Sequence, residues 1–386
     1  MIAFIRPAVL LAACAAVCGA PAARAQHTYT DSAAFVVRMG SDTVAVERYV
    51  RKGGHLRGTF VSRTPRTVVR TYDATLLPDG RVSRIEAWFG LPGAAPMVRA
   101  VTEYAADSAV LRVTRGDSTA VQRFATGGVI FPFIGQSAAL YEQAVMHALR
   151  QRGDSVRVMQ VSTGGGAPWE MVIRRMGGDS VGVVNFEGAS RLRVDRAGRI
   201  VRFDGRGSTD KVLIERLGSF DVDAFAAAGA ARDARGQGMG NLSPRDSAVA
   251  TVGGAHLWVD YGRPSKRGRQ VVGYLIPFDS IWRTGANAAT QLRTDRDLAF
   301  GSTVVPAGTY SVWTQATRAG WRLILNRQTG QWGTEHDAAQ DFASIPLAIT
   351  RADPPVERFT IVVEPTATGG VLALVWDDTR ASAAFT

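Results

Sequence analysis

The sequence predicts an all-β protein built mainly of antiparallel strands, and two observations support this fold class. Short apolar segments recur about every 8 to 12 residues and are separated by Gly, Asp, Ser and Pro. A Gly-Asp-Ser turn begins at Gly116, Gly153 and Gly178, each time before a segment that contains valine. Glycine tolerates a positive φ and aspartate caps its own turn, so we expect hairpin turns at these three sites.

The first 25 residues predict a secretory signal peptide. Residues 8–18 form a small and apolar run, and Ala23-Arg-Ala25 is an A-x-A cleavage signal before Gln26. A second interpretation stays open, because Leu11-Ala-Ala-Cys14 matches a lipobox in which the cysteine is lipidated. We therefore expect export to the periplasm or the extracellular space, with a lipid anchor at Cys14 as the alternative. No later apolar run approaches the roughly 20 residues of a membrane helix.

We predict that residues 26–223 form an N-terminal domain. Its expected fold is a strongly curved antiparallel sheet or half-barrel with one helix. The helix is indicated by apolar residues at helical spacing, which are Tyr141, Ala144, Val145, Ala148 and Leu149. We expect this helix to pack on one open sheet. A half-barrel has room for a lipid-like ligand, so such a ligand is one interpretation of this domain.

A Gly/Ala-rich linker is predicted at residues 224–241, because apolar content falls and glycine repeats there. Residues 242–386 then predict a C-terminal β-sandwich or jelly-roll-like domain. Its residues 255–261 alternate between two faces, with Leu257, Val259 and Tyr261 on one and His256, Trp258 and Asp260 on the other. Residues 371–376 are apolar enough for a strand buried on both faces.

An ordered set of motifs marks this C-terminal part. They are Ser243-Pro244, Tyr261-Gly-Arg-Pro-Ser265, Gly268-Arg269, Trp282-Arg-Thr-Gly-Ala-Asn287, Pro306-Ala-Gly-Thr-Tyr310, Trp332-Gly333 and the strand that ends at Trp376. Through these motifs, residues 243–386 resemble the exported bacterial domain of unknown function family 2911, which has no established activity. Members of that family often carry Glu after the asparagine, whereas this chain has Ala288. The N-terminal domain is recognised as a member of no family.

Arginine and tryptophan residues in these motifs predict a ligand site. Arginine offers forked donors to carboxylate, phosphate or sulfate, and tryptophan offers a flat face to sugar-like or aromatic ligands. The candidate ligand-binding residues are Tyr261, Arg263, Arg269, Trp282, Arg283, Asn287 and Trp332. The alternative is a fold-supporting role, in which Asn287 closes a tight turn and Arg283 pairs with Asp279 or Asp260.

Charge composition adds little to this picture. The net charge of +11 comes almost entirely from arginine, since only Lys52, Lys211 and Lys266 are lysines. The arginines follow strand-like spacing and are not clustered with stacking aromatic residues, so we expect no nucleic-acid binding. Solvated strand faces explain the bias, and attraction to an anionic envelope surface or an acidic glycan is the functional alternative. The only cysteines, Cys14 and Cys18, lie in the predicted signal, so no disulfide is expected.

Catalytic signatures are weak, so enzyme activity is not favoured. Gly178-Asp-Ser-Val-Gly182 matches G-x-S-x-G, but a strand follows where a nucleophile elbow needs a helix. Glu335-His-Asp337 is a run of neighbouring loop residues, which rarely converge on one ion, so neither a metal nor another cofactor is expected. No signal for an oligomeric state is present.

Together these patterns favour an exported two-domain β-protein that binds a small anionic or sugar-like ligand or acts as an envelope-associated accessory protein. The alternative is a periplasmic hydrolase with its site between the two domains. That alternative requires an acid, base or nucleophile beside the arginines, with Asp260, Asp279, His256 and Glu335 as the candidates.

Overall fold

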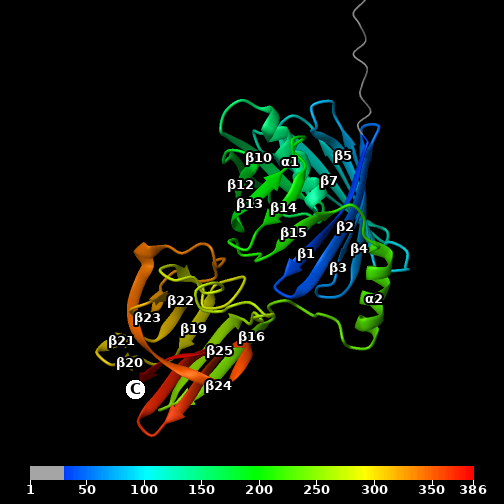
Figure 1. Ribbon diagram of the computed structural model, residues 1–386. Coiled ribbons are helices and arrows are strands. Elements are labelled where there is room, and N and C mark those ends of the chain that lie inside the picture. Colours follow the sequence, from blue (N-terminus) through cyan, green and yellow to red (C-terminus); the bar gives the residue numbers. More distant parts are fainter. Residues whose placement is uncertain (1–29) are drawn as a thin grey trace, which may run out of the picture.

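A computed structural model describes residues 30–386, so the predicted signal peptide and the Cys14 alternative lie outside the described residues. The chain forms a 15-stranded sheet followed by an 8-stranded sheet, with a separate two-stranded hairpin (Figure 1). All pairs of neighbouring strands are antiparallel except β9 and β10. The prediction of an all-β, mainly antiparallel fold is therefore confirmed. Within residues 30–386, neither helix is long and apolar enough to cross a membrane.

The first sheet runs in the order β8-β7-β6-β5-β4-β3-β2-β1-β15-β14-β13-β12-β11-β10-β9. Its strands are β1 Asp31–Met39, β2 Asp42–Lys52, β3 His55–Ser62, β4 Val68–Leu76, β5 Val82–Gly90, β6 Val98–Tyr104, β7 Ser108–Arg115, β8 Ser118–Ala125, β9 Ile130–Phe133, β10 Ser155–Ser162, β11 Trp169–Arg175, β12 Ser180–Asn185, β13 Gly188–Val194, β14 Ile200–Asp204 and β15 Leu213–Leu217. Its two ends approach each other, because Ala109, Ile130 and Val161 share one apolar cluster. The sheet is thus a nearly closed barrel, more complete than the predicted half-barrel.

The predicted Gly-Asp-Ser turns have two different structural settings. Gly116 and Gly178 have positive φ, and each lies in the connection of an antiparallel hairpin, β7–β8 and β11–β12 respectively. Gly153 also has a positive φ, but it lies between helix α1, Ala138–Arg150, and β10. The third turn therefore connects a helix to a strand, and the prediction of a hairpin turn there is wrong. The same residue types favour any tight turn, so they do not tell the two settings apart.

Helix α1 is the helix that the apolar spacing predicts, and it is buried far more completely than one packed on an open sheet. Ser137 caps it by accepting a hydrogen bond from the Leu140 amide. Glu142 and Gln143 are buried as well as its apolar stripe. The helix contributes to one core with strands from both halves of the sheet. The interior of the barrel is therefore occupied by a helix.

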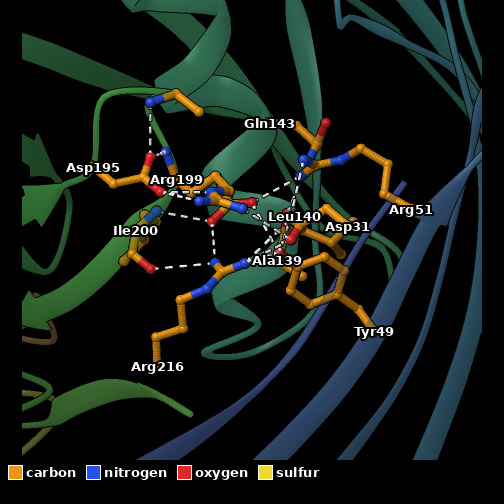
Figure 2. A network of polar contacts seen from close by, with 12 residues as sticks. Asp31, Tyr49, Arg51, Ala139, Leu140, Gln143, Asp195, Arg199, Ile200 and Arg216 are labelled. Carbon is orange, nitrogen blue, oxygen red and sulfur yellow. Dashed lines mark hydrogen bonds and ion pairs between the residues drawn. The ribbon is translucent and has the colours of Figure 1, made fainter. Parts of the chain in front are cut away.

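Buried charges hold α1 in place (Figure 2). The Glu142 carboxylate accepts hydrogen bonds of 2.8 Å from Arg51, from Arg216 and from the amide of Ile200. Asp31 accepts from Tyr49 at 2.5 Å and from Arg216 at 3.1 Å. One acid on the helix and one on β1 thus share the same arginines. In this barrel network of Asp31, Tyr49, Arg51, Glu142 and Arg216, both carboxylates have cationic partners.

A second helix, α2 at Val222–Ala234, replaces the first part of the predicted linker at residues 224–241. Val222 and Ala226 pack on Val36, Val46 and Val61 of the first sheet. The composition is rich in alanine, which favours a helix, but its apolar face is narrow. The segment therefore reads as a linker from composition alone, although it forms a helix against the barrel (Figure 1).

The second sheet runs β16-β17-β19-β22-β23-β24-β25, and β18 pairs with β22. Its strands are β16 Arg245–Val252, β17 Ala255–Gly262, β18 Ile281–Trp282, β19 Thr290–Thr294, β22 Gly308–Thr317, β23 Gly320–Asn326, β24 Asp341–Thr366 and β25 Gly369–Phe385, beside the hairpin β20 Leu298–Phe300 and β21 Thr303–Val305. Residues of all the long strands from β17 on enclose one apolar core. A 3-10 turn at Ala338–Gln340 precedes β24.

Candidate functional site

A cavity of about 480 Å³ lies between loops of the first sheet and loops of the second part. Residues 187–188 and 207–211 form one wall, and residues 280–287 and 332–334 form much of the other. Five of the seven candidate residues line it, namely Arg269, Trp282, Arg283, Asn287 and Trp332. The cavity therefore collects most of the Arg/Trp cluster and places it against the barrel.

Trp282 anchors this wall in the core of the second sheet. Its ring stacks on Trp376 with centroids 6.0 Å apart and meets Phe359 edge-on at 5.0 Å. Its indole N–H donates to the Gly285 carbonyl at 3.0 Å, which closes the following turn. Thr284 in that turn is fully buried at a φ of 51°. Stacked rings on one side and a strained turn on the other hold the segment 282–287 rigidly.

Gly333 allows the two wall segments to touch. A Cβ at this position would collide with the Cδ of Arg283 and the carbonyl oxygen of Asn287. With no side chain there, the Gly333 amide donates to the Asn287 carbonyl at 3.0 Å. Arg283 donates to the same carbonyl at 3.2 Å. Close backbone approach thus explains the Trp-Gly motif, and it fixes the direction of the Arg283 side chain.

Arg283 does not have the acidic partner expected of a bracing residue. Asp260 pairs instead with Arg245, and within residues 30–386 Asp279 forms no ion pair. Burial lowers the pKa of Arg283 to about 10, and no carboxylate offsets this cost. The predicted pairing of Arg283 with Asp279 or Asp260 is therefore wrong, because Asp260 is engaged by Arg245 of β16 and neither acid lies in the cavity wall beside Arg283.

Two more cations line the cavity. Arg269 donates to the carbonyls of Lys266 and Ser265 at 2.8 Å and 2.6 Å. Lys211, at a φ of 55°, lies with its Nζ 5.7 Å from the ring centroid of Tyr274. Burial, followed by the charges of Arg283 and Arg269, lowers the pKa of Lys211 to about 8. In the described part of the chain, none of the three cations forms an ion pair.

Two carboxyl groups on the barrel side were not among the sequence candidates. Glu187 and Asp210 line the cavity and interact with each other. Burial, and then the charge of Asp210, raises the pKa of Glu187. Burial also raises the pKa of Asp210. Two facing carboxyl groups cannot both ionise cheaply, so we expect this pair to hold one proton near neutral pH.

The remaining candidates lie away from the cavity. Tyr261 is buried in the core, edge-on to Phe359. Arg263 pairs with Asp246 at 2.8 Å and donates to the Phe359 carbonyl. Both support the fold at this position.

The acids and the histidine proposed for a hydrolase do not converge on the arginines. His256 bonds Thr251 at 3.0 Å, and Glu335 accepts from the Trp332 amide at 3.4 Å. Neither these two residues nor Asp260 and Asp279 line the cavity. Within residues 30–386, no three His, Cys, Asp or Glu side chains form a group that could hold a metal ion.

Comparison with known proteins adds a family for one part of the chain. Residues 243–385 match the family described as "Protein of unknown function (DUF2911)", which confirms the resemblance inferred from the motifs. No curated protein matches the chain.

Two solved structures are similar in part, both at a TM-score of 0.34. One is a duf1089 family protein from Pseudomonas aeruginosa, 12% identical over 43% of this chain and 92% of that chain. The other is a beta-barrel-like protein of domain of unknown function DUF1849 from Brucella abortus, 9% identical over 49% and 95%.

Proposed function

We propose that the chain is an exported binding protein that holds a small anionic, hydroxylated ligand in the cavity between its two sheets. One observation carries this proposal: Lys211, Arg269 and Arg283 line one cavity, and among the described residues none of them forms an ion pair. A half-buried cation without a counter-charge is costly, and an anionic ligand would supply that charge. Arginine forks suit a carboxylate, phosphate or sulfate group.

Neutral polar groups and exposed rings around the cations favour a sugar-like ligand. Thr209 and Asn287 offer hydroxyl and amide groups. The Glu187–Asp210 pair offers oxygen acceptors to ligand hydroxyls. Trp332 and Phe186 are 39% and 45% exposed, so ring faces are accessible at the cavity. Such a mixture of planar apolar faces with a few polar groups is typical of a small-molecule site.

A lipid-like ligand in the barrel has less support. Helix α1 occupies the interior, and its buried side chains share one core with the surrounding strands. The three cations and the cavity lie outside this core. We therefore place the ligand between the sheets and not inside the barrel.

Export rests on the A-x-A signal at Ala23-Arg-Ala25. On this proposal the mature protein begins at Gln26 and works in the periplasm or outside the cell. N-terminal sequencing of the secreted protein tests it. A lipidated Cys14 at the N-terminus would instead establish the membrane-anchored alternative.

The second candidate function is hydrolysis at the same cavity, and the Glu187–Asp210 pair is the observation in its favour. Two carboxyl groups that hold one proton can supply a general acid and a general base. The two candidates differ in what these groups do. Glu187→Gln and Asp210→Asn would abolish turnover in a hydrolase, whereas a binding protein would return its ligand unchanged.

A thermal-shift screen against organic acids, acidic sugars and sugar phosphates, followed by calorimetry, tests the proposal. We expect at least one anion to raise the melting temperature of the protein and Lys211→Gln to abolish that shift. Lys52→Gln is the matched control, because Lys52 is exposed on the barrel and makes the same change of charge. Affinity should fall above pH 8, since Lys211 loses its charge there. A shift that is equal in both variants would place the ligand elsewhere.

A further inference from the structure

A second hollow, of about 800 Å³, adjoins the cavity. The two share Gly207, Lys211 and Pro277 in their walls, so Lys211 stands at their junction. The second hollow lies along the outer face of β11, β12 and β13, where residues 273–277 of the second part face it. We call it the groove. Cavity and groove together form one continuous path between the two parts of the protein.

Strand register explains the shape and charge of the groove. Arg174 of β11 pairs with Gly182 of β12, which pairs in turn with Arg191 of β13. Residues opposite one another in a sheet point to the same face, so both arginines flank a position without a side chain. Met176 packs over Gly182, and the next pair on the same face is Val184 with Ala189. The result is a shallow apolar strip with a cation on each side.

Arg174 and Arg191 differ from the other arginines of the groove. Arg206 pairs with Asp204 at 2.5 Å, and Arg175 donates to the last carbonyls of α1, the nearest at 2.7 Å. Within residues 30–386, neither Arg174 nor Arg191 forms an ion pair. Five cations thus follow one path without a carboxylate partner, namely Arg174, Arg191, Lys211, Arg269 and Arg283.

We infer that this path binds an acidic oligosaccharide, with one anionic sugar unit in the cavity and at least one more along the groove. The inference rests on the proposed function and deepens it, since it names a polymer as the ligand. Repeated cations match a chain whose units each carry a charge. The apolar strip and the Tyr274 ring supply the flat surfaces that sugar rings cover.

Two other ligand classes fit the groove less well. An amphiphile with its anionic head in the cavity would place its apolar tail beside Arg174 and Arg191, which would lose hydration without gaining a partner. A single-stranded nucleic acid needs a series of stacking rings along its path. The groove has one aromatic residue, Tyr274, so successive bases would find no second ring along it.

The test is calorimetry on the full mature chain with uronic acids and their oligomers. Monomers, trimers and pentamers of galacturonate, glucuronate and mannuronate are the probes, beside a thymidine oligonucleotide of similar charge. We expect a trimer to bind at least about tenfold more tightly than its monomer, because a second anchored unit adds to the first. The double variant R174Q/R191Q should remove most of that gain and leave monomer binding unchanged.

The control is R115Q/R123Q, which removes two exposed arginines of β7 and β8, away from the groove, and should change neither affinity. Equal affinity for monomer and oligomer, with monomer binding still dependent on Lys211, would overturn the inference and leave the proposed function intact. No binding of any acidic sugar would overturn the inference, and the proposed function would fall with it if the organic acids and sugar phosphates also failed to bind. Tighter binding of the oligonucleotide than of every sugar would show that the path serves nucleic acid.

Discussion

The barrel network and the charged residues of the cavity differ in how their charges are balanced. The cavity residues are Lys211, Arg269, Arg283, Glu187 and Asp210, which we call the cavity cluster. In the barrel, Glu142 receives three donors, including Arg51 and Arg216, so its charge is compensated internally. In the cavity, Arg283 and Lys211 have no ion pair among the described residues. A closed set of charges supports a fold, whereas an open set leaves room for the charge of the proposed ligand.

Backbone conformation separates the same two regions. Six residues other than glycine within 30–386 have a positive φ, and three of them, Lys211, Thr284 and Asn287, belong to the segments that form the cavity. No residue of the barrel network is among the six. Such conformations cost free energy, of order 1 to 3 kcal/mol each, and occur preferentially at binding and active sites. Backbone strain is therefore found in the segments that form the cavity and not in the barrel network.

The largest effect expected is the loss of Glu142. Glu142→Ala leaves Arg51 and Arg216 buried around an empty site, and breaking a buried network in this way costs about 3–5 kcal/mol. Urea unfolding followed by circular dichroism measures the change in the free energy of unfolding. The control is Glu170→Ala, which removes an exposed pair with Arg157 and should cost about 0–1 kcal/mol. Equal losses would remove the distinction drawn between the two regions.

A smaller loss is expected from Gly333→Ala. The added Cβ meets Arg283 and the Asn287 carbonyl, and a forced shift of well-packed atoms costs about 1–3 kcal/mol. Anion binding should weaken in the same variant, because Arg283 is displaced. Gly218→Ala is the control, since no atom lies within reach of its Cβ and its φ is not positive. If Gly333→Ala is as stable as Gly218→Ala and binds normally, the wall is not rigid.

The third prediction concerns pH. Folded Glu187 has a raised pKa, so it keeps a proton that the unfolded chain releases above the ordinary value of 4.5. The folded state then binds more protons, and its stability falls as pH rises between about 5 and 8, by at most about 1.4 kcal/mol per pH unit. Glu187→Gln should remove the part of this decline that comes from Glu187, and the remainder is expected from Glu47, whose pKa burial raises to about 7. A wild-type stability that rises over the same pH range would contradict the assignment of a shared proton to the pair.

The smallest loss of stability is expected from Arg283→Ala. No buried acid is left without a partner, so the free energy of unfolding should change by less than about 1 kcal/mol. Binding of an anion should nevertheless be lost. Arg263→Ala, which removes a pair with Asp246 outside the cavity, is the control and should keep its ligand. A loss of several kcal/mol in Arg283→Ala would make this arginine a structural residue like Arg216.

Local patterns in the sequence were enough for the fold class but not for every element. Helical spacing from Tyr141 to Leu149 locates α1, and the glycine turns at Gly116 and Gly178 locate two hairpins. Helix α2 was not predicted, because an alanine-rich segment without a broad apolar face resembles a linker in composition. Closure of the barrel depends on contacts between its first and last strands, which no local pattern reports.

The sequence predicted one wall of the cavity but not the other. The Trp332-Gly333 motif marks a position in the sequence where the structure shows close backbone approach to Arg283 and Asn287. Glu187 and Asp210 carry no comparable signal, because each is a single acid in a loop and becomes part of the site only when the sheets meet. Tyr261 is the opposite case, since its place in the inward face of an alternating strand already indicated the core.

Because of the position of the cavity, the proposed ligand would be a thermodynamic link between the two sheets. Its walls at residues 207–211 and 280–287 come from different sheets, so full affinity requires both walls in place. Linkage is reciprocal, and a ligand that binds only the closed arrangement must resist separation of the sheets by the same free energy. The covalent connection through α2 keeps the two walls at a high effective concentration. A bound anion would therefore stabilise the contact between the two halves of the chain, and its release would weaken that contact.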